Sequence, residues 1–323
     1  MPAAPLASRD RARSRGGSAL PIIVAAFACA CVTHEAAPTD EVPPVGSPQR
    51  SFPIDDAAAP DASPPPPLEA ACDPSTGFGA ASSIALGEAS DDVSPRLVAD
   101  ERTLFFASER AGGAGAHDLY VATRASRLDP FETPRPLSAL ATADDERDPS
   151  PSADGRALFF TSASELRVAR RAEPGAAFDP PRSVDVRGAT HPFFAASSRR
   201  LWLALGEAGQ QDLVTASERD DGSFAPPEPV AGLPTAGAQL HPVLSADGLE
   251  LLFVSATDVD AGSPAVVHAR RESIDAPFGV AVDVEGLPPR AEPGWLSRDG
   301  CRLYFSAPSD DGGRRIFTAS RAR

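Results

Sequence analysis

The chain has 323 residues, of which 42% are hydrophobic, so it is long enough for one large β domain or two ordinary domains. Acidic residues outnumber basic residues 45 to 30, and the net charge of -15 makes binding to nucleic acid or to anionic lipid unfavourable. Every basic residue is arginine. The absence of lysine excludes a Walker A phosphate loop and the Schiff-base chemistry of lysine, including that of pyridoxal phosphate.

Residues 1–30 have the pattern of a signal peptide. Arginines at positions 9, 11, 13 and 15 precede an apolar run that extends from Ala19 to Ala30. This run is shorter than the roughly 20 residues that a transmembrane helix requires. Small residues before a cysteine resemble the bacterial lipoprotein box, and this resemblance implies lipidation of Cys31 or, alternatively, of Cys29. Simple cleavage without a lipid is the other interpretation.

Residues 31–71 are predicted to be a disordered linker rich in proline and alanine. Ten prolines lie between residues 32 and 71, where Phe52 is the only aromatic residue. Such a segment buries too little apolar surface to offset the entropy lost on ordering. Behind a lipid-bearing cysteine, it would hold the folded domain at residues 72–323 away from the membrane.

From residue 72 onward, one unit occurs five times. Each copy contains a proline-bearing segment, a turn and an apolar run, and the turns lie at positions 100, 154, 197, 247 and 299. The apolar runs are Leu104–Phe106, Leu158–Phe160, Leu201–Leu203, Leu251–Phe253 and Leu303–Phe305. Two shorter segments also recur. The last of them follows only the first four units, and its fifth copy, Phe78–Ile84, precedes the first unit. We therefore expect the N-terminal strand to complete the blade that the C-terminus begins.

The chemistry of the unit predicts how it folds. Asp-Gly between two apolar runs predicts a type I′ hairpin, because both central residues of that turn need a positive φ. The runs are continuously apolar, which indicates strands that are covered on both faces. Four strands in each of five units predict an all-β fold, a five-bladed β-propeller of four-stranded antiparallel blades.

The repeats resemble the WD40-like PD40 repeats of TolB-type bacterial envelope propellers. The first unit matches the family pattern most fully, through Ser94-Pro95, Leu104-Phe105-Phe106, Ser108-Glu109-Arg110, Gly112-Gly113, Gly115 and Asp118-Leu119-Tyr120. The resemblance implies a propeller located at the cell envelope. Glu101 and Ser198 stand where the other copies have the turn glycine.

Cys72 lies just before the closing strand, and Cys301 lies in the blade that this strand would complete. After export, both cysteines would be in an oxidising compartment. A disulfide between them would lock the ring shut. The alternative is two free thiols.

Five polar residues occupy the same repeat position, just before or near the proline of the innermost strand: Ser94, Asp148, His191, His241 and Glu292. Equivalent positions of a propeller form a ring, here at one mouth of the central channel, where imidazoles and carboxylates could bind a metal ion or a polar peptide. We expect the simpler role of capping each inner strand, with no metal and no cofactor, because the spacing between blades favours separations too large for one ion. His117 is expected on a hairpin tip, outside this ring.

The chain has no G-x-S-x-G, C-x-x-C or H-E-x-x-H motif. We therefore predict a monomeric, non-catalytic module on the periplasmic side of the cell envelope, an outer-membrane lipoprotein that binds an envelope protein or peptide. Nucleic acid is not an expected partner, and the membrane is contacted only through the lipid anchor. One alternative is a five-bladed carbohydrate-active enzyme, a glycosidase or lyase, which needs two carboxyl groups about 5 to 9.5 Å apart. Its candidates are Asp92, Asp148 and Glu292. A further alternative is a spacer protein without a specific partner.

Overall fold

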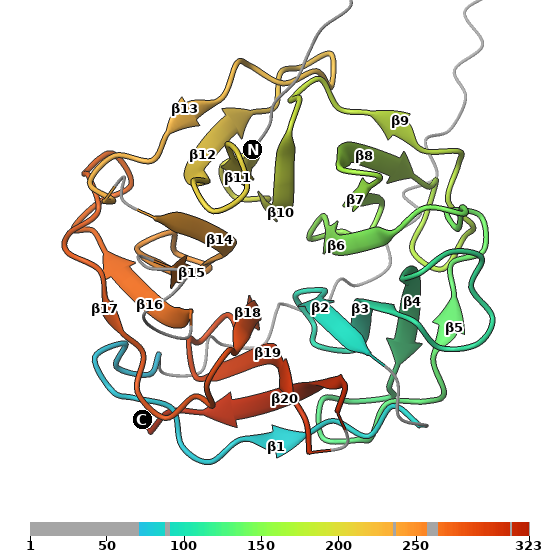
Figure 1. The fold of residues 1–323 in the computed structure, drawn as a ribbon, viewed down its shortest axis with the longest axis horizontal. Coiled ribbons are helices and arrows are strands. Elements are labelled where there is room, and N and C mark those ends of the chain that lie inside the picture. Colours follow the sequence, from blue (N-terminus) through green and yellow to red (C-terminus); the bar gives the residue numbers. More distant parts are fainter. Residues whose placement is uncertain (1–70, 88–90, 235–236, 257–263, 311, 323) are drawn as a thin grey trace, which may run out of the picture. The chain divides into compact units, whose positions relative to one another are not determined.

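The computed structural model describes residues 71–323, apart from residues 88–90, 235–236, 257–263, 311 and 323. The expected signal peptide at residues 1–30, the lipidation of Cys31 or Cys29, and residues 31–70 of the expected linker lie outside the described residues. Within the described part, the regular elements are all strands (Figure 1). No helix in this part of the chain is long and apolar enough to cross a membrane.

Five four-stranded antiparallel sheets surround a common centre (Figure 1), which confirms the predicted five-bladed β-propeller. Blade 1 contains β2 (Asp92–Leu97), β3 (Thr103–Ser108), β4 (Asp118–Thr123) and β5 (Arg135–Pro136). Blade 2 contains β6 (Glu146–Pro151), β7 (Ala157–Ser162), β8 (Glu165–Arg170) and β9 (Arg182–Ser183). Blade 3 contains β10 (Ala189–Ala195), β11 (Arg200–Leu205), β12 (Asp212–Ser217) and β13 (Glu228–Pro229). Blade 4 contains β14 (Ala238–Leu244), β15 (Glu250–Ala256), β16 (Ala265–Arg270) and β17 (Val282–Asp283). Blade 5 contains β18 (Glu292–Leu296), β19 (Arg302–Pro308), β20 (Arg314–Ser320) and β1 (Ser82–Ser83).

Blade 5 takes its outermost strand from the N-terminal side of blade 1. β1 pairs antiparallel with β20, with Ser82 opposite Thr318. The Ile84 N–H donates to the Ile316 carbonyl at 2.9 Å. In Figure 1, β1 lies along the outer edge of β20, so two segments far apart in the sequence belong to one sheet.

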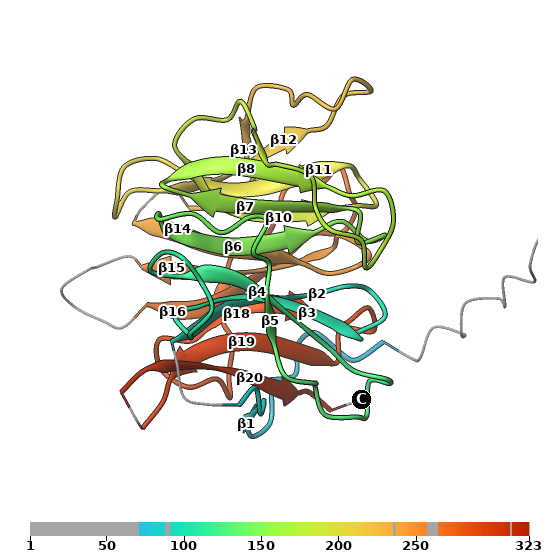
Figure 2. The ribbon, with the colours of Figure 1, turned by 90° about the vertical axis from the view of Figure 1, so that its right-hand side faces the viewer.

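The apolar run of each second strand is buried on both faces. In β3, Leu104 and Phe106 pack into one cluster with Tyr304 of blade 5. Phe105 faces the other way and packs with Phe160 of blade 2. Figure 2 shows blades 2, 1 and 5 as successive layers, between which these clusters lie. Burial of one such side chain contributes about 1.5 to 3 kcal/mol, so the contacts between blades form the core of the domain.

The Asp-Gly hairpins are not the predicted type I′ turns. In blade 2, Gly155 has a φ of 66°, but Asp154 is not in the positive-φ region. The Gly155 N–H donates to the Ser152 carbonyl at 2.9 Å, so the left-handed residue is the last of the turn. Asp154 Oδ1 accepts from the Ser152 hydroxyl at 2.6 Å and from the Arg156 N–H at 3.0 Å. The aspartate therefore fixes the turn through its side chain rather than through its own φ.

In blade 1, Glu101 occupies the left-handed turn position in place of glycine, with a φ of 58°. Its Oε2 accepts from Arg302 Nε at 3.1 Å and from the Tyr304 hydroxyl at 3.3 Å, and both partners belong to blade 5. The side chain that replaces glycine thus joins the first and last blades. In blade 3, where Ser198 replaces the glycine, the positive φ moves to Arg199 instead.

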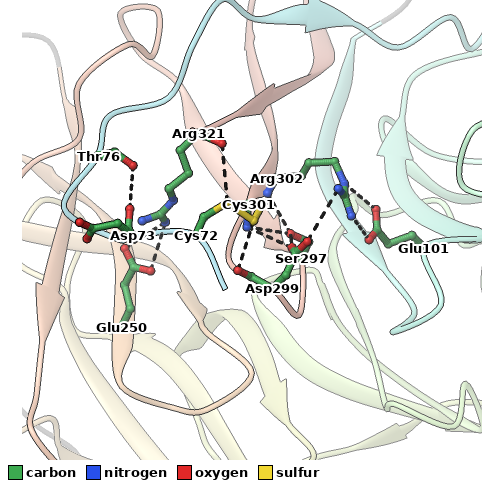
Figure 3. Close-up of a disulfide and its surroundings, with 10 residues drawn as sticks. All are labelled: Cys72, Asp73, Thr76, Glu101, Glu250, Ser297, Asp299, Cys301, Arg302 and Arg321. Atoms are coloured by element: carbon green, nitrogen blue, oxygen red, sulfur yellow. Dashed lines mark hydrogen bonds and ion pairs between the residues drawn. A yellow bond between two sulfur atoms is a disulfide. The ribbon is translucent and has the colours of Figure 1, made fainter. Parts of the chain in front are cut away.

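Cys72 and Cys301 form a disulfide that fastens the chain ahead of β1 to blade 5 (Figure 3). The two residues are 229 positions apart in the sequence, and their Cα atoms are 5.1 Å apart. Close by, Arg321 Nη2 donates to both carboxylate oxygens of Glu250 in blade 4 at 3.1 Å. Together with the ion pair of Glu101, this contact joins blade 5 to both of its neighbours.

Candidate functional site

Four of the five residues predicted to form a ring share an unusual backbone conformation. Ser94, Asp148, His191 and His241 have φ values of 54°, 54°, 52° and 53°. Each lies with its following proline at a register shift of an innermost strand, in β2, β6, β10 and β14 respectively. A left-handed conformation costs a residue other than glycine about 1 to 2 kcal/mol. Its recurrence at the same register shift in four blades makes this conformation a feature of the repeated unit.

The side chains of these residues meet at the centre of the ring. The Ser94 hydroxyl donates to Asp148 Oδ1 at 2.7 Å. His241 Nδ1 lies 4.0 Å from the same oxygen, and the rings of His191 and His241 meet edge to face with centroids 4.0 Å apart. Metal-ligating atoms of Asp148, His191 and His241 all lie within 4.8 Å of one another. The expectation that blade spacing separates these groups too widely for one ion is therefore wrong.

Glu292 reaches the same place from a different backbone position. In β18 it pairs with Ser306, and only Gly294 is inserted at the register shift, so Glu292 lies in the ladder rather than in the bulge. Its Oε2 is nevertheless 4.0 Å from His241 Nε2 and 3.0 Å from Arg314 Nη2. We call Ser94, Asp148, His191, His241 and Glu292 the central cluster.

A buried arginine lies beside the central cluster. Arg96 Nη2 donates to the Pro242 carbonyl at 3.4 Å, and Arg96 Cζ lies 5.4 Å from the centroid of the Phe193 ring. Nε and Nη1 of Arg96 have no hydrogen-bond partner among the described residues. Burial lowers the pKa of Arg96 to about 10, and the negative charge of Asp148 opposes this shift. Arg96 is therefore cationic at neutral pH and offsets the charge of Asp148.

Burial also shifts the pKa values of the cluster. It lowers the pKa of His241 well below the usual value, and the positive charges of His191 and Arg96 lower it further. The His241 imidazole is therefore neutral at neutral pH, with a lone pair on one ring nitrogen. Burial raises the pKa of Glu292, although the Arg314 guanidinium opposes this shift. The cluster can thus accept hydrogen bonds or coordinate a cation.

His117 was not expected in any constellation, yet it is buried, with 1% of its surface exposed. Its Nε2 lies 3.2 Å from Asp91 Oδ2, and its Nδ1 lies 2.9 Å from Arg147 Nη2 and 3.1 Å from Asp145 Oδ1. Asp91 precedes His117 by 26 residues and Asp145 follows it by 28. No local sequence signal connects these segments, since strand pairing within blade 1 brings Asp91 to His117 and packing of blade 2 against blade 1 adds Asp145.

Asp92, a carboxylate candidate of the enzyme alternative, is already engaged. Both of its oxygens lie 2.8 Å from Arg110 Nη2, and Oδ1 also accepts from the Ser108 hydroxyl at 2.7 Å. A carboxylate whose two oxygens are held by these contacts is not free to contact a substrate. Asp148 and Glu292 are therefore the remaining carboxylates for that alternative.

A groove of 1330 Å³ lies at the turns of blades 1, 2 and 5. Its lining combines apolar side chains, such as Val98, Leu137 and Phe178, with arginines that include Arg171 and Arg302. None of the central cluster lines this groove, so the groove and the cluster are separate features.

The fold and the central cluster define the protein as a five-bladed β-propeller with a polar centre. No family model matches the chain, and no curated protein matches it. Its fold is similar to that of TolB from Acinetobacter baumannii, with 14% identity over 72% of this chain and 55% of that chain, and a TM-score of 0.44. The chain thus spans about half the length of that TolB.

Two glycosidases have similar folds. RS223-Beta-xylosidase is 11% identical over 74% of this chain and 94% of that chain, with a TM-score of 0.53. An exo-beta-1,3-galactanase from Phanerochaete chrysosporium is 13% identical over 76% of this chain and 66% of that chain, with a TM-score of 0.54. At these identities the similarity concerns the fold alone, which serves binding proteins and enzymes alike.

Proposed function

We propose that the chain is an exported, lipid-anchored β-propeller that binds an envelope protein or peptide without catalysing a reaction. The observation that carries this proposal is that four residues with a positive φ bring their side chains together at the centre of the ring. A rigid ring can present these groups to a partner with little further loss of conformational entropy. Export and anchoring rest on the sequence of residues 1–30 and on Cys31 or Cys29.

The chemistry of the central cluster suits a polar peptide segment. Asp148 and Glu292 accept hydrogen bonds from amide or ammonium groups, while a neutral imidazole of His241 both donates and accepts. The full chain, used as bait in an envelope extract, should capture a partner that the double variant His191→Ala and His241→Ala does not capture. The control is His268→Ala, which removes an imidazole from β16, where it contacts Glu250 at 3.2 Å. Capture that is unchanged in the double variant would locate binding at the hairpin tips and overturn the central site.

The anchoring is tested by labelling cells with a radioactive fatty acid. We expect the wild-type chain and the Cys29→Ser variant to carry the label, and the Cys31→Ser variant to lose it. A label that is lost only with Cys29→Ser would move the lipid to that cysteine. An unlabelled wild-type chain would instead support cleavage without a lipid.

A carbohydrate-active enzyme is the second candidate. The observation in its favour is that Asp148 and Glu292 flank His241, each with an oxygen 4.0 Å from a ring nitrogen. Burial raises the pKa of Glu292, as a general acid requires. Hydrolysis or elimination on a panel of glycans that disappears in Asp148→Asn would establish this activity and overturn the non-catalytic proposal.

A further inference from the structure

We propose that Asp148, His191 and His241 bind one Zn²⁺ ion at the centre of the propeller. One carboxylate oxygen and two imidazole nitrogens lie within 4.8 Å of one another there. Zinc bonds of about 2.0 to 2.2 Å in a tetrahedral site place the ligand atoms about 3.4 Å apart. The three side chains therefore need to approach one another by at most about 1.4 Å to close on the ion. This site goes beyond the proposed capture of a protein, and the two can be measured separately.

The groups around the three ligands orient them toward a common point. Ser94 donates to Asp148 Oδ1 at 2.7 Å, while Asp148 Oδ2 has no partner among the described residues. His191 Nδ1 lies 2.9 Å from Thr190 Oγ1, which leaves Nε2 for the ion. Partners of this kind fix the tautomer and orientation of metal ligands.

His241 is the ligand that most clearly lacks a partner. Its side chain is only 11% exposed, and no hydrogen bond to either of its ring nitrogens occurs in the part of the chain that the structure describes. Nδ1 faces Asp148 and Nε2 faces Glu292, both at 4.0 Å, which is beyond hydrogen-bond distance. A buried polar group without a partner is costly. A metal bound at Nδ1 satisfies that nitrogen, and a shift of about 1 Å would bring the Nε2 hydrogen within hydrogen-bond distance of Glu292.

The charges and donor types select the class of metal. Arg96 offsets the charge of Asp148, and Arg314 pairs with Glu292 at 3.0 Å, so the site carries little net negative charge. Ca²⁺ and Mg²⁺ favour several oxygen ligands and few nitrogens, whereas two imidazoles and one carboxylate suit Zn²⁺ and related transition metals. We therefore expect Zn²⁺ to bind and Ca²⁺ not to compete.

Ligand atoms of Asp91, Glu109 and His117 also lie within 4.8 Å of one another, but this group suits Zn²⁺ less well. His117 Nδ1 faces the Arg147 guanidinium at 2.9 Å, and its Nε2 faces Asp91 Oδ2 at 3.2 Å. Both nitrogens have protein partners, and a guanidinium at ligand distance repels a cation. Within the part of the chain that the structure describes, we therefore expect one Zn²⁺ ion, at the central cluster.

The test is a titration of the metal-stripped full chain with Zn²⁺ by isothermal calorimetry. Loss of one outer partner of a metal ligand typically weakens binding about 10- to 100-fold, so we expect that range for Ser94→Ala. Removal of a ligand in Asp148→Asn, His191→Ala or His241→Ala should raise the Kd for Zn²⁺ by more than about 100-fold. Asp148→Asn keeps the shape of the side chain, and circular dichroism of each metal-free variant shows whether it is folded. His268→Ala, the control, should bind as the wild type does.

Co²⁺ provides a second readout, because its visible absorption reports nitrogen ligands and should be lost in His241→Ala. A wild-type chain that binds no Zn²⁺, or a folded Asp148→Asn that binds it with unchanged Kd, would overturn the proposal. Equal competition by Ca²⁺ would overturn the choice of metal class. These titrations contain no protein partner. The capture of an envelope protein is measured separately, in buffer that contains a metal chelator. A failure to bind Zn²⁺ is therefore distinguishable from a failure of that capture.

Discussion

Replacing both Cys72 and Cys301 by alanine should lower the free energy of unfolding and loosen the junction between the two ends of the propeller. The disulfide joins residues 229 positions apart. Chain entropy alone then predicts a loss of about 5 kcal/mol, since the closed loop restricts the unfolded chain. Alanine is chosen because both cysteines are buried, with 5% of their surface exposed, and a hydroxyl there would need a partner.

The value of about 5 kcal/mol is an upper limit, because the unfolded chain retains residual structure that already restricts it. In the folded variant, other contacts still hold the N-terminal segment. The Cys72 N–H donates to the Asp299 carbonyl at 2.9 Å, and the Gly79 N–H donates to the Ser320 carbonyl at 2.8 Å. β1 also stays paired with β20. With the buried Phe78 and the bond from the Ile84 N–H, these contacts hold the N-terminal segment in place. We therefore expect amide hydrogen exchange to accelerate first in residues 72–84 and β20, before global unfolding.

The measurement is equilibrium urea unfolding of three samples: the oxidised wild type, the wild type with dithiothreitol, and the double alanine variant. The reduced wild type and the variant should unfold at nearly the same urea concentration, well below that of the oxidised wild type. Peptide mapping without reductant should recover the two cysteines in one linked fragment. A difference in unfolding free energy smaller than about 1 kcal/mol would refute the argument from loop closure.

Three other substitutions test single features of the fold. Glu101→Gln should lower stability by about 2 kcal/mol, between the values for exposed and buried ion pairs, because it removes the nearer carboxylate of Arg302 and leaves only Asp299, at 4.0 Å. Chemical denaturation measures this loss. Gly294→Ala should lower the melting temperature, since its Cβ would lie 2.2 Å from a carbonyl oxygen of blade 1, an overpacking that costs about 1 to 3 kcal/mol. Ser152→Ala should raise the pKa of Asp154, because the hydrogen bond from the Ser152 hydroxyl is the largest cause of its lowered pKa, ahead of the bond from the Arg156 N–H. NMR titration of the carboxyl group measures this pKa.

The sign of the last effect follows from linkage. The pKa of Asp154 is lower in the folded chain, so the carboxylate contributes stability above its unfolded pKa of about 4 and loses it as the pH falls further. In Ser152→Ala this contribution is smaller at neutral pH, and stability should decline less steeply below about pH 4. Asp129→Asn, at an exposed aspartate of blade 1 whose side chain has no partner among the described residues, is the control for the first substitution and should leave stability unchanged. An unchanged melting temperature in Gly294→Ala would show that blade 5 and blade 1 are less closely packed than the structure indicates.

The fold could be predicted because it depends on content that repeats. Apolar runs such as Leu104–Phe106 specify strands buried on both faces wherever they occur, and five copies specify five blades. The type of turn could not be predicted, because the Asp154 side chain bonds to the Ser152 hydroxyl, and this bond decides the backbone angles. The sequence also placed Glu292 one residue away from its true repeat position. Its proline is followed by Gly294, which moves the bulge along the strand.

The central cluster shows where sequence reasoning ends. Repeat position correctly indicated that His191 and His241 are equivalent, but their contact depends on a left-handed φ, which the residue types do not reveal and the following proline disfavours. If this conformation matters only for capping a strand, glycine serves as well as histidine. We expect His191→Gly to be more stable than His191→Ala by about 1 kcal/mol, because only alanine retains the strain, while both variants lose the imidazole and Zn²⁺. Equal melting temperatures of the two variants would mean that position 191 is not strained, and the argument from strain to function would fail with it.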